Sequence, residues 1–201
     1  MGALVPVIGL LFAAAITPGP NNVIVMEAGA RGGIAAALGA TLGVIAGSLM
    51  LLTLVWLGVG AAMQAWPGLP IALGIGGGAY LAWLGFLLMR ADGNRPDSSK
   101  PVLPATVPGI AAFQLMNPKA WVLVTTAAAA MPAGNDVATL ALLIASVTSI
   151  CLTVWGTAGA LFSRWLARPV ARRWFDRIMG ALMAAFALRI AVDALPQWGG
   201  G

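Results

Sequence analysis

The sequence predicts an all-α integral membrane protein of about six transmembrane helices, arranged as two inverted three-helix repeats whose first helices are broken. Apolar residues make up 60% of the 201 residues and charged residues only 8%, whereas soluble domains are about 25% charged. No charged residue lies between Arg31 and Arg90, and that gap can hold two spans of roughly 20 residues each. Prolines interrupt one apolar segment near Pro18 and another near Pro118. Paired interrupted helices in the two halves of a chain are typical of inverted-repeat transporters.

The composition also argues against several classes of protein. Cys151 is the only cysteine, which excludes an intrachain disulfide and a two-thiol redox relay. The chain contains no histidine, so it lacks the commonest metal ligand and general base. We therefore expect no catalytic residue, no metal site and no cofactor. Loops this short leave no room for a soluble catalytic domain, so an enzyme is not expected.

The first half of the chain, about residues 1–90, begins with the broken segment. Proline lacks a backbone donor and clashes with the preceding turn, so Pro18 and Pro20 should interrupt the helix between residues 17 and 22. The first segment has no basic region of the kind found in signal peptides, so we expect it to be retained. The three apolar segments of this half are expected at residues 3–30, 34–63 and 71–89.

Glycines recur at every fourth position of the second segment, as Gly39, Gly43 and Gly47. Small residues at this spacing let membrane helices approach closely. Internal helix packing is the expected role, and a homodimer is the alternative.

A polar stretch at about residues 91–107 is expected to form a cytoplasmic linker within a single membrane domain. The second half, about residues 108–201, again begins with an interrupted segment, here at Asn117, Pro118 and Lys119. Its apolar segments are expected at residues 108–131, 137–162 and 178–195. Between the last two, residues 163–177 carry five arginines among aromatic residues. This stretch looks like a basic interfacial helix kinked at Pro169, and a cytoplasmic loop that fixes the orientation is the preferred interpretation.

The basic residues indicate an orientation. The formal net charge is +5, and nine of the eleven Lys and Arg residues lie in or beside the links that follow the first, third and fifth segments. Cytoplasmic loops carry an excess of Lys and Arg, so these links should lie in the cytoplasm and both termini outside it. Membrane orientation explains the positive charge, and no nucleic-acid partner is expected.

Two short motifs carry a specific resemblance. Residues 17–21 read TPGPN and residues 117–120 read NPKA, with a further match at residues 32–39. Together they resemble the LysE/RhtB family of bacterial amino-acid exporters over nearly the whole chain. The resemblance implies a multi-pass LysE-type translocator of the bacterial cytoplasmic membrane. Such a protein would export amino acids or close derivatives by secondary active transport, driven by the proton motive force, with proton antiport as the expected mechanism.

Other functions remain open from the residues alone. The chain could export another small solute or a cation, although a cation exporter should carry more acids or histidines in its spans. A non-transporting membrane assembly protein would not need Asn117, Pro118 and Lys119 in the middle of a span. A thiol-disulfide or electron-transfer protein is disfavoured by the single cysteine and the missing histidines.

The two breaks supply the chemistry that an amino-acid zwitterion needs. A half-helix beginning near Asn21 offers free N–H groups and a positive dipole end to the carboxylate. Carbonyls freed before Pro18 and Pro118 could accept from the ammonium. Lys119 is a cation in mid-span, where an ionisable residue is a functional candidate by default, although it could also snorkel to the surface. The candidate substrate-binding residues are Thr17, Pro18, Gly19, Pro20, Asn21, Asn22, Gln114, Asn117, Pro118 and Lys119.

Three further charged positions have candidate roles. Glu27 could carry the coupling proton, or it could form an i, i+4 ion pair with Arg31, which is the preferred interpretation. Arg189 and Asp193 repeat this spacing and are either a structural pair or an outer gate. Asp176 lies among arginines and should pair with them.

Overall fold

The computed structural model describes residues 4–66, 68–92, 103–132 and 136–194. All its regular elements are helical, and the described residues contain no strand. The helices are α1 (Val5–Ile16), α2 (Pro20–Leu54), the π-helix η2 (Val55–Val59), α3 (Gly60–Ala65), α4 (Gly68–Met89), α5 (Val107–Met116), α6 (Pro118–Ala129), α7 (Val137–Leu166) and α8 (Pro169–Ala194).

The prediction of an all-helical membrane protein is confirmed. Three helical stretches among the described residues are long and apolar enough to cross a bilayer: Pro20–Met63, Gly68–Met89 and Val137–Leu166. Two shorter apolar helices, α1 and α5, have 12 and 10 residues. At about 1.5 Å per residue, neither of them alone reaches across a hydrocarbon core of about 30 Å.

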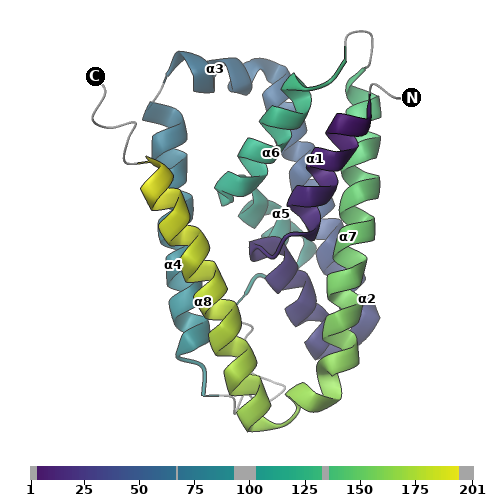
Figure 1. Cartoon of the computed structure of the whole chain (residues 1–201), viewed down its shortest axis with the longest axis vertical. Helices are drawn as coiled ribbons and strands as arrows, with labels where there is room; N and C mark the ends of the chain where they lie inside the picture. The colour runs from purple at the N-terminus through teal and green to yellow at the C-terminus, as the bar shows by residue number, and fades with distance from the viewer. Residues whose placement is uncertain (1–3, 67, 93–102, 133–135, 195–201) are drawn as a thin grey trace.

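The helices form two groups that stand side by side (Figure 1). Helix α2 packs along α7, and α5 packs against α2, while α4 pairs with α8 at the other side of the molecule. The start of α1 and the end of α8 lie at one end, which we call the terminal end (Figure 1). The opposite end holds the α7–α8 junction and the end of α4, where Arg168 and Arg90 lie, and we call it the basic end.

Two glycines with positive φ, Gly33 and Gly58, bend the chain. The first bend was expected as a short link between two segments, and the second was not expected. Gly33 has φ 68° and turns α2 back on itself, as expected for the short link after Arg31. Gly58 has φ 97° inside η2, so the α-helical part of the second segment ends at Leu54. The segment expected at residues 34–63 is helical to its end, as α2, η2 and α3, but the bend at Gly58 was not expected; glycine is the residue that readily adopts such backbone angles.

Residues 163–177 do not form a separate interfacial helix, although the chain breaks at Pro169 as predicted. Helix α7 continues to Leu166, and α8 begins at Pro169. Proline suits the first position of a helix, where its missing N–H would have no intrahelical partner. The arginines are thus divided between the end of one long helix and the start of the next, rather than collected on a helix of their own.

Glycines set the closest helix crossing. A Cβ atom on Gly29 would lie 2.2 Å from the carbonyl oxygen of Gly156, and one on Gly159 would lie 2.0 Å from that of Met26. Alanine at either position would therefore clash with the backbone of the facing helix. Helices α2 and α7 are held in contact along the part of α2 that directly follows the first break.

Candidate substrate site

The structure brings the two predicted breaks together. The first lies between the end of α1 at Ile16 and the start of α2 at Pro20, and the second is the single residue Asn117 between α5 and α6. The side-chain nitrogen of Asn117 donates to Oδ1 of Asn21 at 3.3 Å. Asn117 is only 1% exposed, so this contact joins the two halves of the chain in the interior.

Prolines begin both half-helices that leave the breaks. Pro20 is the first residue of α2, and Pro118 is the first residue of α6. Pro18 and Pro118 mark the two breaks in the sequence, but the proline that begins a half-helix at the first break is Pro20, as Pro118 does at the second. Asn117 ends α5 with extended backbone angles and caps α6, because its Oδ1 accepts from the backbone N–H of Lys119 at 3.1 Å.

The carbonyls at the end of α1 already have partners. Nδ2 of Asn22 donates to the carbonyl of Ala15 at 2.8 Å, and the indole N–H of Trp155 donates to that of Ile16 at 3.3 Å. The hydroxyl of Thr17 donates back to Ala13. These bonds satisfy groups that an interrupted helix would otherwise leave unpaired in the membrane interior.

A carbonyl at the end of α5 also has a hydrogen-bond partner, which comes from the second half of the chain. The indole N–H of Trp121 donates to the carbonyl of Leu115 at 2.8 Å. A Cβ atom on Gly77 of α4 would lie 2.2 Å from the carbonyl oxygen of Met116, so the backbone of α4 closes directly over this break. In this conformation, most of the freed carbonyls are therefore engaged with the protein.

The N-terminus of α2 offers a different environment. Among the described residues, no side chain caps it at Gly19. The ammonium group of Lys119 lies beside it: a Cβ atom on Gly19 would be 2.9 Å from Nζ, and Nζ donates to the carbonyl of Thr17 at 3.4 Å. The positive N-terminal end of α2 and the ammonium group of Lys119 thus lie side by side, and together they attract an anion.

A small cavity of about 40 Å³ lies next to this helix end, and we call it the central cavity. Room of this size holds a few water molecules. On one side, Nε2 of Gln114 donates to Oγ of Ser48 at 2.9 Å. The polar side chains that line the cavity are Asn21, Asn22, Ser48, Gln114, Asn117, Lys119 and Thr148, and its apolar lining includes Leu11, Val44, Leu123, Val124, Ile144 and Leu152.

Most predicted site residues lie at this cavity, but not all. Gly19 and Pro20 line it together with the polar residues. Thr17 and Pro18 are exposed and are not among the described lining residues. Pro118 faces a neighbouring cavity instead. Ser48 and Thr148 were not predicted from the sequence as site residues. Each is a polar residue in the middle of an apolar segment, and this feature could have identified them.

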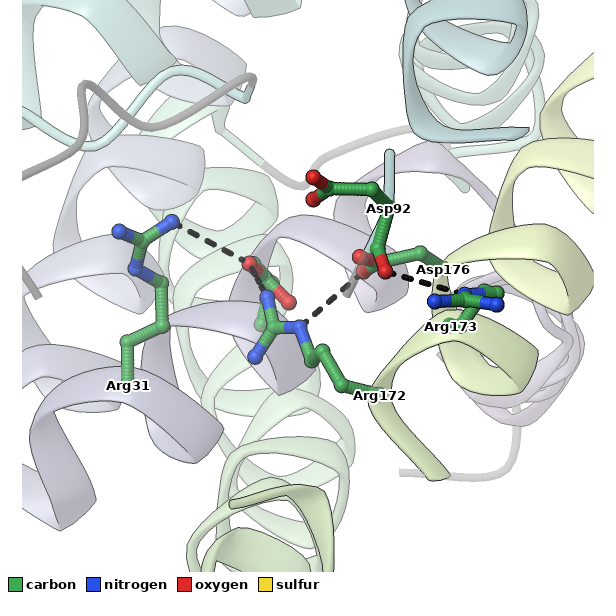
Figure 2. A network of polar contacts seen from close by, with 6 residues as sticks. Arg31, Asp92, Arg172, Arg173 and Asp176 are labelled. Atoms are coloured by element: carbon green, nitrogen blue, oxygen red, sulfur yellow. Dashed lines mark hydrogen bonds and ion pairs between the residues drawn. The ribbon is translucent and has the colours of Figure 1, made fainter. Parts of the chain in front are cut away.

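A buried cluster of charges lies toward the basic end (Figure 2). The guanidinium of Arg172 on α8 forms an ion pair with Glu27 on α2, and its Nε lies 3.2 Å from Oδ1 of Asp176. Glu27 and Asp176 are 5% and 0% exposed. Arg31 lies 3.7 Å from Glu27, so the preferred i, i+4 pair is confirmed, as is the pairing of Asp176 with an arginine.

The closest partner of Glu27 was not predicted from the sequence. Arg172 was assigned to an interfacial helix, whereas it belongs to the first turn of α8 and points inward. Next to it, Nε of Arg173 donates to the carbonyl oxygen of Asp92 at 3.0 Å (Figure 2). The cluster therefore fastens α8 to α2 and to the end of α4. The predicted outer pair is not tested, because the side chain of Asp193 lies outside the described part of the structure.

Comparison with known proteins agrees with this architecture. The family model for the LysE type translocator matches residues 12–194. The chain belongs to the LysE type translocator family. This translocator is 26% identical over 197 residues to a leucine efflux protein of Enterobacter sp. (strain 638), with 92% of each chain covered. It is also 27% identical over 216 residues to an uncharacterized membrane protein of Pseudomonas aeruginosa, with 94% of each chain covered. No solved structure gives a significant match.

Proposed function

We propose that this translocator exports amino acids or close derivatives from the cytoplasm and holds its substrate between the two helix breaks. The observation that carries the proposal is the position of Lys119 Nζ beside the uncapped N-terminus of α2. Membership of the translocator family and the similarity to a leucine efflux protein support transport of an amino acid.

The substrate carboxylate would bind between Lys119 and the N–H groups at the start of α2. A desolvated carboxylate needs a charge partner or several hydrogen-bond donors, and both are present here. The ammonium would find neutral acceptors across the same cavity, in the amide oxygens of Asn21 and Gln114. The described lining of the central cavity contains no acid, which favours a zwitterion over a bare cation as the cargo.

We further propose six membrane crossings built as two inverted repeats in the bacterial cytoplasmic membrane, with the basic end in the cytoplasm. The helix starts support this division. The first half-helix of each repeat has proline at its second position, Pro6 in α1 and Pro108 in α5. The second half-helix has proline at its first position, Pro20 in α2 and Pro118 in α6. Two copies of one structural unit are expected to carry prolines at the same helix positions in the same order.

Transport would require the site to open toward each side in turn. A cavity of about 40 Å³ is far smaller than the roughly 300–1,000 Å³ typical of small-molecule sites. The conformation described is therefore closed around the site. The single-residue break at Asn117 and the short link at residues 17–19 provide hinges for the half-helices.

Proton antiport is the proposed coupling, with Glu27 as the proton carrier. Glu27 is buried on the cytoplasmic side of the site and forms an ion pair with Arg172 of α8. Protonation would remove the charge that holds Arg172 and so loosen α8 from α2. This links proton binding to the opening of one side through a physical contact.

Export of labelled amino acids tests the function. Cells that overproduce the chain would be loaded with a panel of labelled amino acids, and release would be followed with and without a proton uncoupler. We expect faster release of at least one amino acid, abolished by the uncoupler. Release equal to that of cells without the protein for every amino acid would overturn the proposal.

A further inference from the structure

Three consecutive carbonyl oxygens at the end of α1, those of residues 15–17, accept hydrogen bonds from side chains of three other helices. Asn22 of α2 and Trp155 of α7 donate to the first two, at 2.8 and 3.3 Å. The ammonium group of Lys119 on α6 donates to the third, the carbonyl of Thr17, at 3.4 Å. The C-terminal end of a helix carries a partial negative charge, so this end of α1 attracts a cation.

Of these three donors, the ammonium group of Lys119 is the one that can be replaced. Its bond is the longest of the three, and it stands on a long flexible stem. Lys119 is half-buried, whereas Asn22 is 3% exposed. Nζ of Lys119 also lies 5.3 Å from the ring centroid of Phe186 on α8, which is within the range of a cation–π contact. An ammonium that leaves Thr17 therefore keeps a second partner.

The ammonium of Lys119 lies where Gly19 has no side chain. A Cβ atom on Gly19 would be 2.9 Å from Nζ of Lys119 and 3.7 Å from Oδ1 of Asn22. Gly19 has extended backbone angles, φ −170° and ψ 179°, so its conformation does not require glycine. The missing side chain instead leaves room for a cation beside the carbonyl oxygen of Thr17 and the amide oxygen of Asn22. We call this space the ammonium position.

An amino acid carries the same group that fills this position. Its α-ammonium has the charge and the three N–H donors of the lysine ammonium. The break between the two half-helices consists only of residues 17–19, so the negative end of α1 and the positive start of α2 lie close together. A zwitterion fits between them, with its ammonium at Thr17 and its carboxylate at the start of α2. Once the substrate ammonium is bound at Thr17, Lys119 is available to the carboxylate.

We propose that Lys119 fills the ammonium position in the empty transporter and that the ammonium of the substrate replaces it there. Lys119 then pairs with the substrate carboxylate. A ligand without an ammonium leaves Lys119 on Thr17, and a ligand without a carboxylate leaves two cations next to each other, which repel. This inference rests on the proposed export function and narrows the substrate class to compounds with both a free amino group and a free carboxylate.

Thermal unfolding of the purified full-length protein in detergent tests the exchange, because a bound ligand raises the melting temperature without any need for transport. An equimolar mixture of the common amino acids should raise it, and a mixture of their N-acetyl derivatives should need at least about tenfold higher concentrations, the scale of one charge-assisted hydrogen bond. Lys119→Met vacates the ammonium position. This variant should bind methylammonium at least about tenfold more tightly than the wild type, with sodium chloride as the control for ionic strength, and should bind the amino acids more weakly.

Two glycine variants separate the ammonium position from a general effect on α1. Gly19→Ala places a methyl group in that position without straining the backbone, so the concentration of amino acids needed for the same shift should rise at least about tenfold. Gly9→Ala is the matched control within α1, because no atom lies within 4 Å of its added Cβ, and it should bind amino acids as the wild type does.

The outcomes of these measurements distinguish the inference from the proposed function. Equal shifts with free and N-acetylated amino acids, or no gain of methylammonium binding in Lys119→Met, would overturn the inference and leave the export function standing. The Lys119→Met result decides the question even if Gly19→Ala fails to fold. No shift with any mixture would also overturn the inference, and the export assay described above decides separately whether the export function falls with it.

Discussion

The side chain of Asn117 donates to Oδ1 of Asn21 at 3.3 Å, across 96 positions of the chain. Asn117 also donates to Oε1 of Gln114 at 3.3 Å and accepts from the N–H of Lys119 at 3.1 Å. One buried amide therefore caps α6, contacts the first break and orients a wall of the central cavity.

Replacement of Asn117 should affect both stability and transport. Asn117→Ala removes the cap of α6 and leaves buried partners without their bonds, so we expect a loss of about 1–3 kcal/mol and at least a tenfold loss of export. Thermal unfolding in detergent and export assays measure the two effects. Thr106→Ala is the matched control, because it removes the cap of α5 at Gly109 away from the cavity. Export lost equally in both variants would contradict a role of Asn117 in the site.

Lys119 should be needed for transport but not for insertion. Lys119→Met keeps the length of the side chain and removes its charge, so export should fall by at least about tenfold while the protein remains in the membrane fraction. Lys119 is half-buried, and a charge in the middle of a span is costly, so its removal should not decrease stability. Lys119→Arg should retain part of the activity. Wild-type export in Lys119→Met would remove this residue from the site.

The Glu27–Arg172 pair should show strong energetic coupling. Arg172→Met leaves a buried carboxylate without its closest partner, and loss of one member of a buried pair costs about 3–5 kcal/mol. The double variant Glu27→Gln/Arg172→Met should recover only part of this loss, because the buried Asp176 also loses its contact with Arg172. Arg31→Met is the control, since Arg31 is exposed and lies 3.7 Å from Glu27, so its loss should cost less than the loss of the buried Arg172. Additive effects in the double-mutant cycle would contradict the pairing.

The same variants test the coupling role of Glu27. If Glu27 carries the proton, Glu27→Gln should export without dependence on the pH gradient or should not export at all. Measurement of export at fixed substrate with an imposed pH gradient separates these outcomes from normal coupling. Gradient-dependent export at the wild-type level in Glu27→Gln would place the proton elsewhere.

The glycines of the second segment should differ sharply in their tolerance of alanine. A Cβ atom on Gly47 would lie 2.5 Å from Cβ of Gln114 and 2.7 Å from the carbonyl oxygen of Ala111. Overpacking of this kind costs about 1–3 kcal/mol, so Gly47→Ala should destabilise the protein and disturb the cavity wall. At Gly39 no atom lies within 4 Å of an added Cβ, and Gly39→Ala should be neutral or stabilising by about 0.5–1 kcal/mol. Equal melting temperatures would contradict the close packing of α2 on α5.

Acid should weaken the N-terminus of α7. The backbone N–H and the hydroxyl of Thr139 both donate to Oδ1 of Asp136 at 2.8 Å, and these bonds lower the pKa of Asp136 below its ordinary value of 3.8. A lowered folded-state pKa means that the contribution of the cap is complete above the ordinary value and is lost as the pH falls through the lowered one. Asp136→Asn keeps a capping side chain that does not titrate. Its melting temperature should therefore decrease less between about pH 5 and about pH 3 than that of the wild type.

Local rules predicted much of the fold from the sequence. Hydropathy predicted the apolar segments, and the proline breaks were placed within a few residues of where α1 and α5 end. The start of α7 after Asp136 was also predicted correctly. The turn of the chain at Gly58 was not, because a glycine in an apolar segment is compatible with both a straight helix and a left-handed backbone.

The site was predicted in its residues but not in its internal contacts. Asn21, Asn22, Gln114, Asn117 and Lys119 follow from polar or charged side chains at mid-span. Arg172 could not be assigned in the same way, because a basic stretch at a membrane boundary normally faces water and headgroups. The side chain of Arg172 points toward Glu27 because of how α8 packs relative to α2. This packing depends on contacts between residues 145 positions apart.

The two indole hydrogen bonds at the breaks have a consequence for biogenesis. At the second break, the indole of Trp121 donates to the carbonyl of Leu115 only six positions earlier, so this bond can form as soon as α6 has formed. The first break receives its indole from Trp155, 139 positions after Ile16. During synthesis, the hydrogen bond to the carbonyl of Ile16 can therefore form only after α7 has left the ribosome. The half of the site that is synthesised first is therefore completed last. Its unpaired carbonyl stays accessible to quality-control factors for longer than any group of the second break.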